Sequence, residues 1–212
     1  MNKRTLRTGG LWLALFVVWT ALVKTVDVQC MGETGKAVGF ATVNGWFHRL
    51  TGVHMALYTA TDWLGLVPVF VCCAFGALGL KQLIQRKSFA QVDKDILLLG
   101  IYYVLVMACY LAFEMMPVNF RPILIAGRLE ASYPSSTTLL VLSVMPTLAF
   151  QTKRRVKNRS AQKVICLAAG IFAAGMVLGR LISGVHWLTD IAGAVLLSRG
   201  LFYLYAGSAS AA

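Results

Sequence analysis

The chain has 212 residues, of which 58% are hydrophobic and only 13% are charged, and its mean hydropathy is +0.71. A soluble domain is nearer half apolar and about a quarter charged, so this composition excludes an ordinary soluble protein and indicates one integral membrane domain over residues 1–212. The formal net charge of +12 would suggest nucleic-acid binding in a soluble protein, but membrane topology is the first explanation to consider.

Six apolar stretches are candidate membrane spans, because about 20 apolar residues cross a bilayer. They lie at about residues 9–26, 64–84, 96–116, 136–151, 164–181 and 186–206. The first has a basic start like that of a signal peptide but no obvious A-x-A cleavage site, so we expect it to remain as an uncleaved span. The sequence therefore predicts an all-α fold, a bundle of six transmembrane helices.

Basic residues gather on one side of this predicted bundle. They precede the first span and fill the connections after the second and fourth spans, over residues 3–7, 81–94 and 153–163. If the N-terminus is cytoplasmic, all three clusters fall on the cytoplasmic face, as the positive-inside rule expects. The charge then requires no nucleic-acid partner, and we expect a plasma-membrane protein with cytoplasmic N- and C-termini.

Three segments fall on the opposite, outer face of the predicted bundle. They are residues 27–63, residues 117–135 and a tight turn near residues 181–186. The first segment mixes aromatic residues with His48 and His54. Aromatic side chains favour the membrane interface, so this segment could contain a short helix lying in the interface.

The stretch RLISGVHWLTDIAG, residues 180–193, places three ionisable side chains inside an apolar run. His186 and Asp190 are four residues apart, which puts them on one face of a helix. An Asp that accepts a hydrogen bond from one ring nitrogen of a His leaves the other nitrogen free to attack. The planar fork of Arg180 suits a phosphate or a carboxylate. A structural His–Asp pair is the alternative, but ionisable groups at membrane depth are usually functional.

A second stretch on the outer face also suits an anion. Arg121 is followed by a proline, and another proline precedes Ser135, Ser136 and Thr137 at the start of the fourth span. Backbone N–H groups at a helix start bind anions with help from the helix dipole. Plain helix capping does not explain why two arginines, a hydroxyl-rich helix start and a His–Asp pair converge. We therefore predict an active-site pocket at the outer membrane face.

These residues resemble three ordered motifs of the type 2 phosphatidic acid phosphatase superfamily, whose members are integral membrane phosphatases. The third motif is intact as Gly179-Arg180, His186 and Asp190. Arg121-Pro122 matches the end of the first motif, and residues 134–137 match the second. The motifs cover residues 114–190, and the six-span layout extends the resemblance over the whole chain.

The resemblance implies a membrane phosphohydrolase that removes phosphate from a lipid phosphate or an isoprenyl diphosphate. His186 would be the nucleophile that forms a phosphohistidine, and Asp190 would orient it. The phosphate oxygens would be held by two arginines and by the hydroxyl-rich helix start, namely Arg121, Arg180, Ser135, Ser136 and Thr137.

Two positions depart from the family's motifs. Glu114 stands where the first motif has Lys, and Thr137 stands where the second has the His that serves as general acid. Thr cannot donate that proton near neutral pH, and general acid–base catalysis typically contributes about 10²–10⁴-fold. Glu114 adds a negative charge that would repel phosphate unless it is protonated or paired with Arg121 or Arg180.

Three interpretations stay open. An isoprenyl diphosphate loses a phosphate-type leaving group that departs readily, so it needs an acid less than a simple lipid monophosphate does. Alternatively, another residue supplies the proton: Glu114, or else His48 or His54, each of which could equally have a packing role. In the third interpretation, the chain is a catalytically impaired family member that binds, senses or transports a phosphorylated lipid.

The sequence gives no sign of a metal or a cofactor. The five cysteines form no CxxC pair, and most lie in apolar runs, where Cys behaves as a small hydrophobe. We therefore expect neither a metal site nor a cofactor, and the expected partner is the phosphorylated lipid in the membrane. The oligomeric state is left open.

Overall fold

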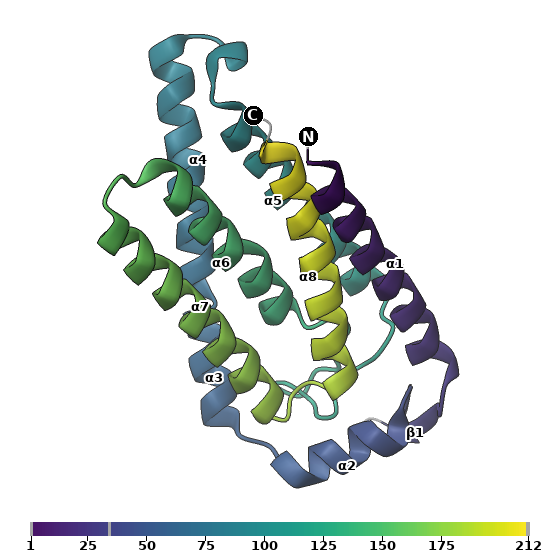
Figure 1. Cartoon of the computed structure of the whole chain (residues 1–212). Coiled ribbons are helices and arrows are strands. Elements are labelled where there is room, and N and C mark those ends of the chain that lie inside the picture. Colours follow the sequence, from purple (N-terminus) through teal and green to yellow (C-terminus); the bar gives the residue numbers. More distant parts are fainter. Residues whose placement is uncertain (1, 34, 211–212) are drawn as a thin grey trace.

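The computed structural model describes residues 2–33 and 35–210 of the chain. Long α-helices run side by side, and a long connection over residues 116–135 joins α5 to α6 (Figure 1). In chain order the elements are α1 (Lys3–Thr25), β1 (Gln29–Met31), β2 (Lys36–Val38), α2 (Ala41–Thr51), α3 (Met55–Leu64), α4 (Leu66–Arg86), the 3₁₀ helix η1 (Phe89–Gln91), α5 (Lys94–Met115), α6 (Ser136–Arg155), α7 (Arg159–Ile182) and α8 (Leu188–Ala209). The prediction of an all-α fold is confirmed.

Within the described residues, five helical segments are long and apolar enough to cross a membrane: α1, the consecutive helices α3 and α4, α5, α7 and α8. The chain is thus an integral membrane protein. Helix α6, the fourth expected span, has 20 residues and is long enough, but it is not apolar enough to be counted among them. The count of six spans therefore stays a prediction.

The low apolarity of α6 has a structural reason. This helix packs against α4, α5, α7 and α8, so its polar side chains face other helices. Thr147 Oγ1 shares a hydrogen bond of 2.7 Å with the Tyr103 hydroxyl, and Gln151 Nε2 donates to the Tyr205 hydroxyl over 2.7 Å. Polar groups satisfied inside a bundle can replace apolar surface, because they are not exposed to lipid.

Helices α1 and α8 approach each other closely along their length (Figure 1). A Cβ added at Gly200 of α8 would lie 2.6 Å from the Leu13 side chain of α1. Small residues at such a contact allow two helix backbones to pack tightly. The first span is therefore part of the bundle and supports α8, the helix that carries Asp190.

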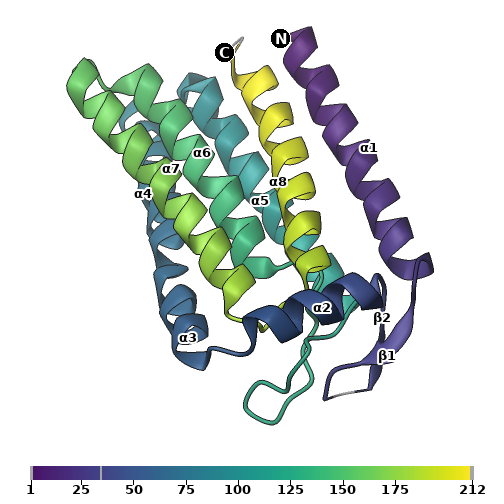
Figure 2. The same cartoon turned by 60° about the horizontal axis from the view of Figure 1, so that its bottom comes forward.

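Residues 27–51 cover one end of the bundle, whereas residues 55–63, which were expected outside the spans, form α3 and belong to the second candidate span. Helix α2 crosses that end below α8, with the β1–β2 hairpin beside it (Figure 2). Asn44 of α2 exchanges two hydrogen bonds with Thr189, at 3.0 and 3.3 Å, and thereby fixes the start of α8. The short helix that the sequence suggested is present at Ala41–Thr51.

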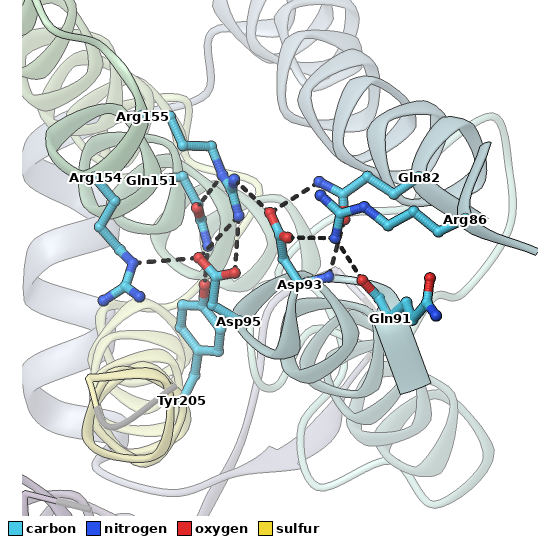
Figure 3. A network of polar contacts seen from close by, with 9 residues as sticks. All are labelled: Gln82, Arg86, Gln91, Asp93, Asp95, Gln151, Arg154, Arg155 and Tyr205. Carbon is cyan, nitrogen blue, oxygen red and sulfur yellow. Dashed lines mark hydrogen bonds and ion pairs between the residues drawn. The ribbon is translucent and has the colours of Figure 1, made fainter. Parts of the chain in front are cut away.

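The opposite end holds both termini and a network of charged residues (Figures 1 and 3). Asp95 is buried and accepts a hydrogen bond from Arg155 Nη2 at 2.8 Å, and its Oδ2 forms an ion pair with Arg154 Nε at 3.2 Å. Asp93 pairs with Arg86 and Arg155, both at 2.9 Å. Hydrogen bonds from Arg86 first, and then from Arg155 and Gln82, lower the pKa of Asp93 to about 2. These contacts join α4, α5 and α6 at this end.

Candidate active site

The turn between α7 and α8 positions His186. Gly184 in this turn has a φ of +71°, and a Cβ there would lie 1.9 Å from the Gly52 carbonyl oxygen, so only glycine fits. Asp190 Oδ2 then accepts from the Trp187 backbone N–H at 2.9 Å and caps the start of α8. The local sequence therefore holds His186 and Asp190 on one buried surface.

His186 and Asp190 are brought together as the sequence predicted, but without a hydrogen bond between them. His186 Nδ1 lies 3.7 Å from Asp190 Oδ2, and the two residues are 3% and 0% exposed. Asp190 Oδ1 accepts from Asn119 Nδ2 at 3.2 Å. Within the described part of the chain, His186 Nδ1 has no hydrogen-bond partner. Catalytic hydrogen bonds are often long without substrate and shorten when it binds.

Arg180 contacts the other ring nitrogen of His186. Its Nη2 lies 3.5 Å from His186 Nε2, and the residue is only 1% exposed. Its guanidinium lies 4.8 Å from the ring centre of Tyr58 in α3, and the Arg121 guanidinium lies 5.6 Å from that same ring. Tyr58 thus gathers the two arginines next to the histidine.

Arg121 is anchored by one carboxylate and keeps donors free. Its Nε lies 3.0 Å from Glu130 Oε2. Among the described residues, nothing accepts a hydrogen bond from the buried Nη1 of Arg121 or from the buried Nε of Arg180. Unsatisfied buried donors are costly, and here they belong to two cations that suit an anion's oxygens.

Burial and positive charge both act on His186. Burial first, and then the nearby Arg121 and Arg180, hold the pKa of this histidine well below its usual value of 6.5. The imidazole is therefore neutral at physiological pH. A neutral ring has a lone pair on one nitrogen, which is the form that a nucleophile requires.

The start of α6 lies against this cluster. Ser135 is the N-cap residue and is fully buried, and its backbone N–H donates to the Asp190 carbonyl oxygen at 3.2 Å. Its hydroxyl donates to Thr138 Oγ1 at 3.1 Å. Ser136 and Thr137 occupy the first turn, where backbone N–H groups lack partners inside the helix.

Two cavities meet beside Ser136. A cavity of about 190 Å³ is lined by Arg121, Glu114, Glu130 and Ser136. A second cavity, of about 400 Å³, is lined by Ser136, Thr137, Asp62 and mainly apolar residues of α4, α5 and α6. Both cavities also include Tyr110. Glu114 therefore lies in the same cavity as Arg121, as its position in the sequence suggested.

Sequence reasoning missed the contribution of α3. Tyr58 contacts both arginines, Thr61 Oγ1 lies 3.4 Å from Arg180 Nη1, and Asp62 Oδ1 lies 3.7 Å from the same nitrogen. The signal was a Tyr and an Asp four residues apart just before an apolar run, which places both on one helix face. Asn119 was missed too, since a lone Asn in a loop has no distinctive pattern.

The two other histidines lie at the same end in different surroundings. The His48 ring packs against Trp187, with ring centres 5.5 Å apart, and burial lowers the pKa of His48. His54 Nε2 lies within hydrogen-bond distance of the Thr51 carbonyl oxygen, at 2.8 Å. The His48 contact is a packing contact, and the His54 contact is a capping contact with a backbone carbonyl group.

Comparisons with known proteins agree on one family. A model of the PAP2 superfamily matches residues 66–210, which is more than half of the chain. The chain is also similar to the crystal structure of the first transmembrane PAP2 type phosphatidylglycerolphosphate phosphatase from Bacillus subtilis, with a TM-score of 0.70 and 17% identity over 96% of each chain. At that identity the likeness concerns the fold. No curated protein matches the chain.

Proposed function

The chain belongs to the PAP2 superfamily of membrane phosphatases, and from this premise we propose that it removes phosphate from a phosphorylated membrane lipid at the cluster of His186, Arg180 and Arg121. One observation carries the proposal. Arg180 Nη2 lies 3.5 Å from His186 Nε2, so a phosphate bound to the arginine would also meet the nucleophilic nitrogen. Since the cluster draws on α3, α7, α8 and the α5–α6 connection, residues 1–212 would work as one domain.

The proposed reaction has two steps. His186 Nε2 attacks phosphorus, an N–P bond forms and the P–O bond to the lipid breaks, which gives a phosphohistidine. Water then attacks phosphorus, the N–P bond breaks and inorganic phosphate is released. Asp190 would orient His186, while Arg121, Arg180 and the start of α6 would neutralise charge on the equatorial oxygens.

The arrangement of the two cavities supports a lipid substrate. The polar cavity contains Arg121, and the larger apolar cavity opens beside Ser136 and Thr137. A phosphate held by the arginines would therefore leave its hydrocarbon chain next to an apolar groove between α4, α5 and α6. Burial of apolar groups away from polar surroundings is favourable, so the groove fits the lipid tail.

Thr137 favours a substrate with a good leaving group. We therefore propose that the protein prefers an isoprenyl diphosphate to a lipid monophosphate, since the diphosphate releases a phosphate-type anion with little need of a general acid. A glycerol or prenol alkoxide leaves poorly without a proton.

We also place the active site on the outer face of the plasma membrane. Both termini lie at one end of the bundle, together with the basic start of α1 and the basic α6–α7 connection (Figure 1). His186 lies at the other end, under α2. Accessibility tags at Lys157 and at the C-terminus should both report the cytoplasm. A tag that is accessible from outside at either site would contradict the proposed orientation.

A binding, sensing or transport role is the alternative, and one observation favours it. His186 Nδ1 and Asp190 Oδ2 are 3.7 Å apart, beyond hydrogen-bond distance, and Thr137 replaces the motif's acid. In this alternative the arginines would hold the lipid phosphate without cleaving it.

The deciding experiment is phosphate release by the purified protein in detergent. The substrates are an isoprenyl diphosphate, an isoprenyl monophosphate and phosphatidic acid. We expect release that His186→Ala abolishes and that His54→Ala retains, with the diphosphate fastest. Equal rates on all three would remove the leaving-group argument, and no release despite bound lipid phosphate would favour the alternative role.

A further inference from the structure

A carboxylate outside the three sequence motifs lies next to Arg180 of the catalytic cluster. Asp62 is in the last turn of α3, and its Oδ1 lies 3.7 Å from Arg180 Nη1. The other terminal nitrogen of the same guanidinium, Nη2, lies 3.5 Å from His186 Nε2. Asp62 and His186 therefore approach different nitrogens of one arginine, and a phosphate bound to that arginine would lie within reach of both.

The packing of α3 holds Asp62 at this place. A Cβ added at Gly179 of α7 would lie 2.7 Å from Thr61 Cγ2, so α3 and α7 approach each other very closely. The His54 N–H before α3 donates to the Ser183 carbonyl oxygen at 2.9 Å. Asp62 is 59% exposed, which leaves its carboxylate accessible to water and to substrate.

The position of the lipid tail distinguishes Asp62 from the other carboxylates. The oxygen that leaves is the one attached to the lipid. Asp62 lines the apolar groove together with Thr137, whereas Glu114 and Glu130 line the polar cavity around Arg121. A tail in the groove would thus bring the leaving oxygen to the side of Asp62, where the family's motif has its acid.

We propose that Asp62 supplies the proton that Thr137 cannot, which lets lipid monophosphates react, while an isoprenyl diphosphate, which needs no acid, remains the faster substrate. This inference rests on the proposed phosphatase function. In the first step the Asp62 carboxyl gives its proton to the lipid oxygen as the P–O bond breaks and the N–P bond of the phosphohistidine forms. In the second step the Asp62 carboxylate takes a proton from the attacking water as the N–P bond breaks, which restores the starting state.

The test compares Asp62→Asn with wild type on two substrates of different leaving group. With an isoprenyl monophosphate, we expect kcat to fall about 10²–10⁴-fold, the range typical of a lost general acid or base. With para-nitrophenyl phosphate, whose leaving group needs no proton, the first step persists. The variant should then show a burst of para-nitrophenol followed by a slow steady state, because the second step lacks its base.

Matched variants separate Asp62 from its competitors. Glu114→Gln and Glu130→Gln remove the carboxylates of the polar cavity, and Glu33→Gln removes an exposed carboxylate on the β1–β2 hairpin at the same end. Only Asp62→Asn should combine the leaving-group dependence with the burst. Either signature in Glu114→Gln or Glu130→Gln would transfer the role to that residue.

Two further outcomes would overturn the inference, and they are distinguishable from failure of the function itself. If Asp62→Asn loses activity equally on both substrates without a burst, Asp62 only positions Arg180. If Asp62→Asn keeps wild-type rates, Asp62 has no part in proton transfer. A wild-type protein that releases no phosphate would instead disprove the phosphatase function.

Discussion

The two ends of the bundle both bury charged residues, but only one end satisfies them. In the network at the terminal end, Asp95 is met by Arg154 and Arg155 at 3.2 and 2.8 Å. At the other end, Arg121 Nη1 and His186 Nδ1 are buried without a hydrogen-bond partner among the described residues. Because unpaired buried polar groups are costly, a saturated network indicates a structural role and an unsaturated one indicates a candidate binding site.

Substitution of His186, the proposed nucleophile, gives the largest expected difference between the ends. His186→Ala should lower kcat by at least about 10³-fold, as removal of a catalytic nucleophile does elsewhere, while thermal unfolding in detergent changes little. Phosphate release and unfolding are measured on the same preparation. If the variant instead lost stability and kept its kcat, His186 would have a structural role, as the charged residues at the terminal end do.

Arg180→Lys tests whether the guanidinium fork, rather than its charge, serves the site. The lysine keeps one positive charge but cannot contact phosphate and His186 Nε2 with two nitrogens. We expect a loss of about 10²–10³-fold in kcat, the range for one lost donor to a transition-state oxygen. Arg154→Lys at the terminal end is the matched control and should leave kcat unchanged. An equal loss of kcat in Arg180→Lys and Arg154→Lys would mean that the two ends do not differ in their role in catalysis.

Asp95→Ala tests the saturated end in the same way. The change leaves Arg154 and Arg155 short of one partner, and breaking a buried ion pair costs about 3–5 kcal/mol. Both arginines are about one-third exposed and can hydrate, so we expect about 2 kcal/mol of lost unfolding free energy. The kcat of the folded protein should stay at the wild-type value. A fall in kcat without lost stability would couple this network to the site.

The two ends also differ in how well their side-chain contacts could be predicted from the sequence. Arg180, His186 and Asp190 fall within 11 residues of the chain at fixed spacing, so their proximity follows from one helix–turn–helix and could be predicted. Asp93 and Asp95 meet Arg154 and Arg155 across two helices about 60 residues apart. Their pairing depends on how α5 packs on α6, which periodicity does not reveal.

The same reason explains what was missed at the site. Tyr58 and Asp62 lie about 120 residues before Arg180 and reach it only because α3 packs on α7. The span pattern was predicted because apolar length is a local property. For α6 it remains a prediction, because its polar residues are satisfied by neighbouring helices that the sequence does not place.

Filling the groove between α4 and α5 tests whether the substrate connects the two ends. The apolar cavity beside Thr137 adjoins a second one of about 330 Å³, and Cys72 and Tyr103 line both cavities. The second cavity extends to Phe89 of η1 at the terminal end. A chain that fills both would pass most of the way across a hydrocarbon core of about 30 Å, which suits a long isoprenyl chain.

Gly76→Leu would narrow this second cavity. A Cβ at Gly76 meets no atom of the described residues within 4 Å, and the same holds for Gly170, which lines a cavity between α6, α7 and α8. We expect Gly76→Leu to raise KM about tenfold for a long-chain isoprenyl diphosphate and to spare a short-chain one, with Gly170→Leu neutral on both. If Gly76→Leu changed KM equally for the long-chain and the short-chain substrate, the lipid chain would occupy only the cavity at the site end.

Acid should affect the two ends in different pH ranges. The pKa of His186 lies well below 6.5, chiefly because of burial. Below pH 6.5 the unfolded chain therefore binds a proton that the folded chain does not. The free energy of unfolding consequently decreases as the pH is lowered, by at most about 1.4 kcal/mol per pH unit. Asp93, with a pKa of about 2, contributes stability that is complete above its ordinary value of 3.8 and is lost only as pH falls toward 2.

Wild type and His186→Asn should therefore diverge in stability between pH 6.5 and 5, with the variant falling less. His48, whose pKa burial also lowers, contributes the slope that both proteins share. Phosphate release per folded molecule should not decline through pH 6.5 on account of His186, because the ring stays neutral and nucleophilic there. A kcat that halves near pH 6.5 and follows protonation of His186 would mean that its ring is hydrated, which would contradict the burial that holds its pKa below 6.5.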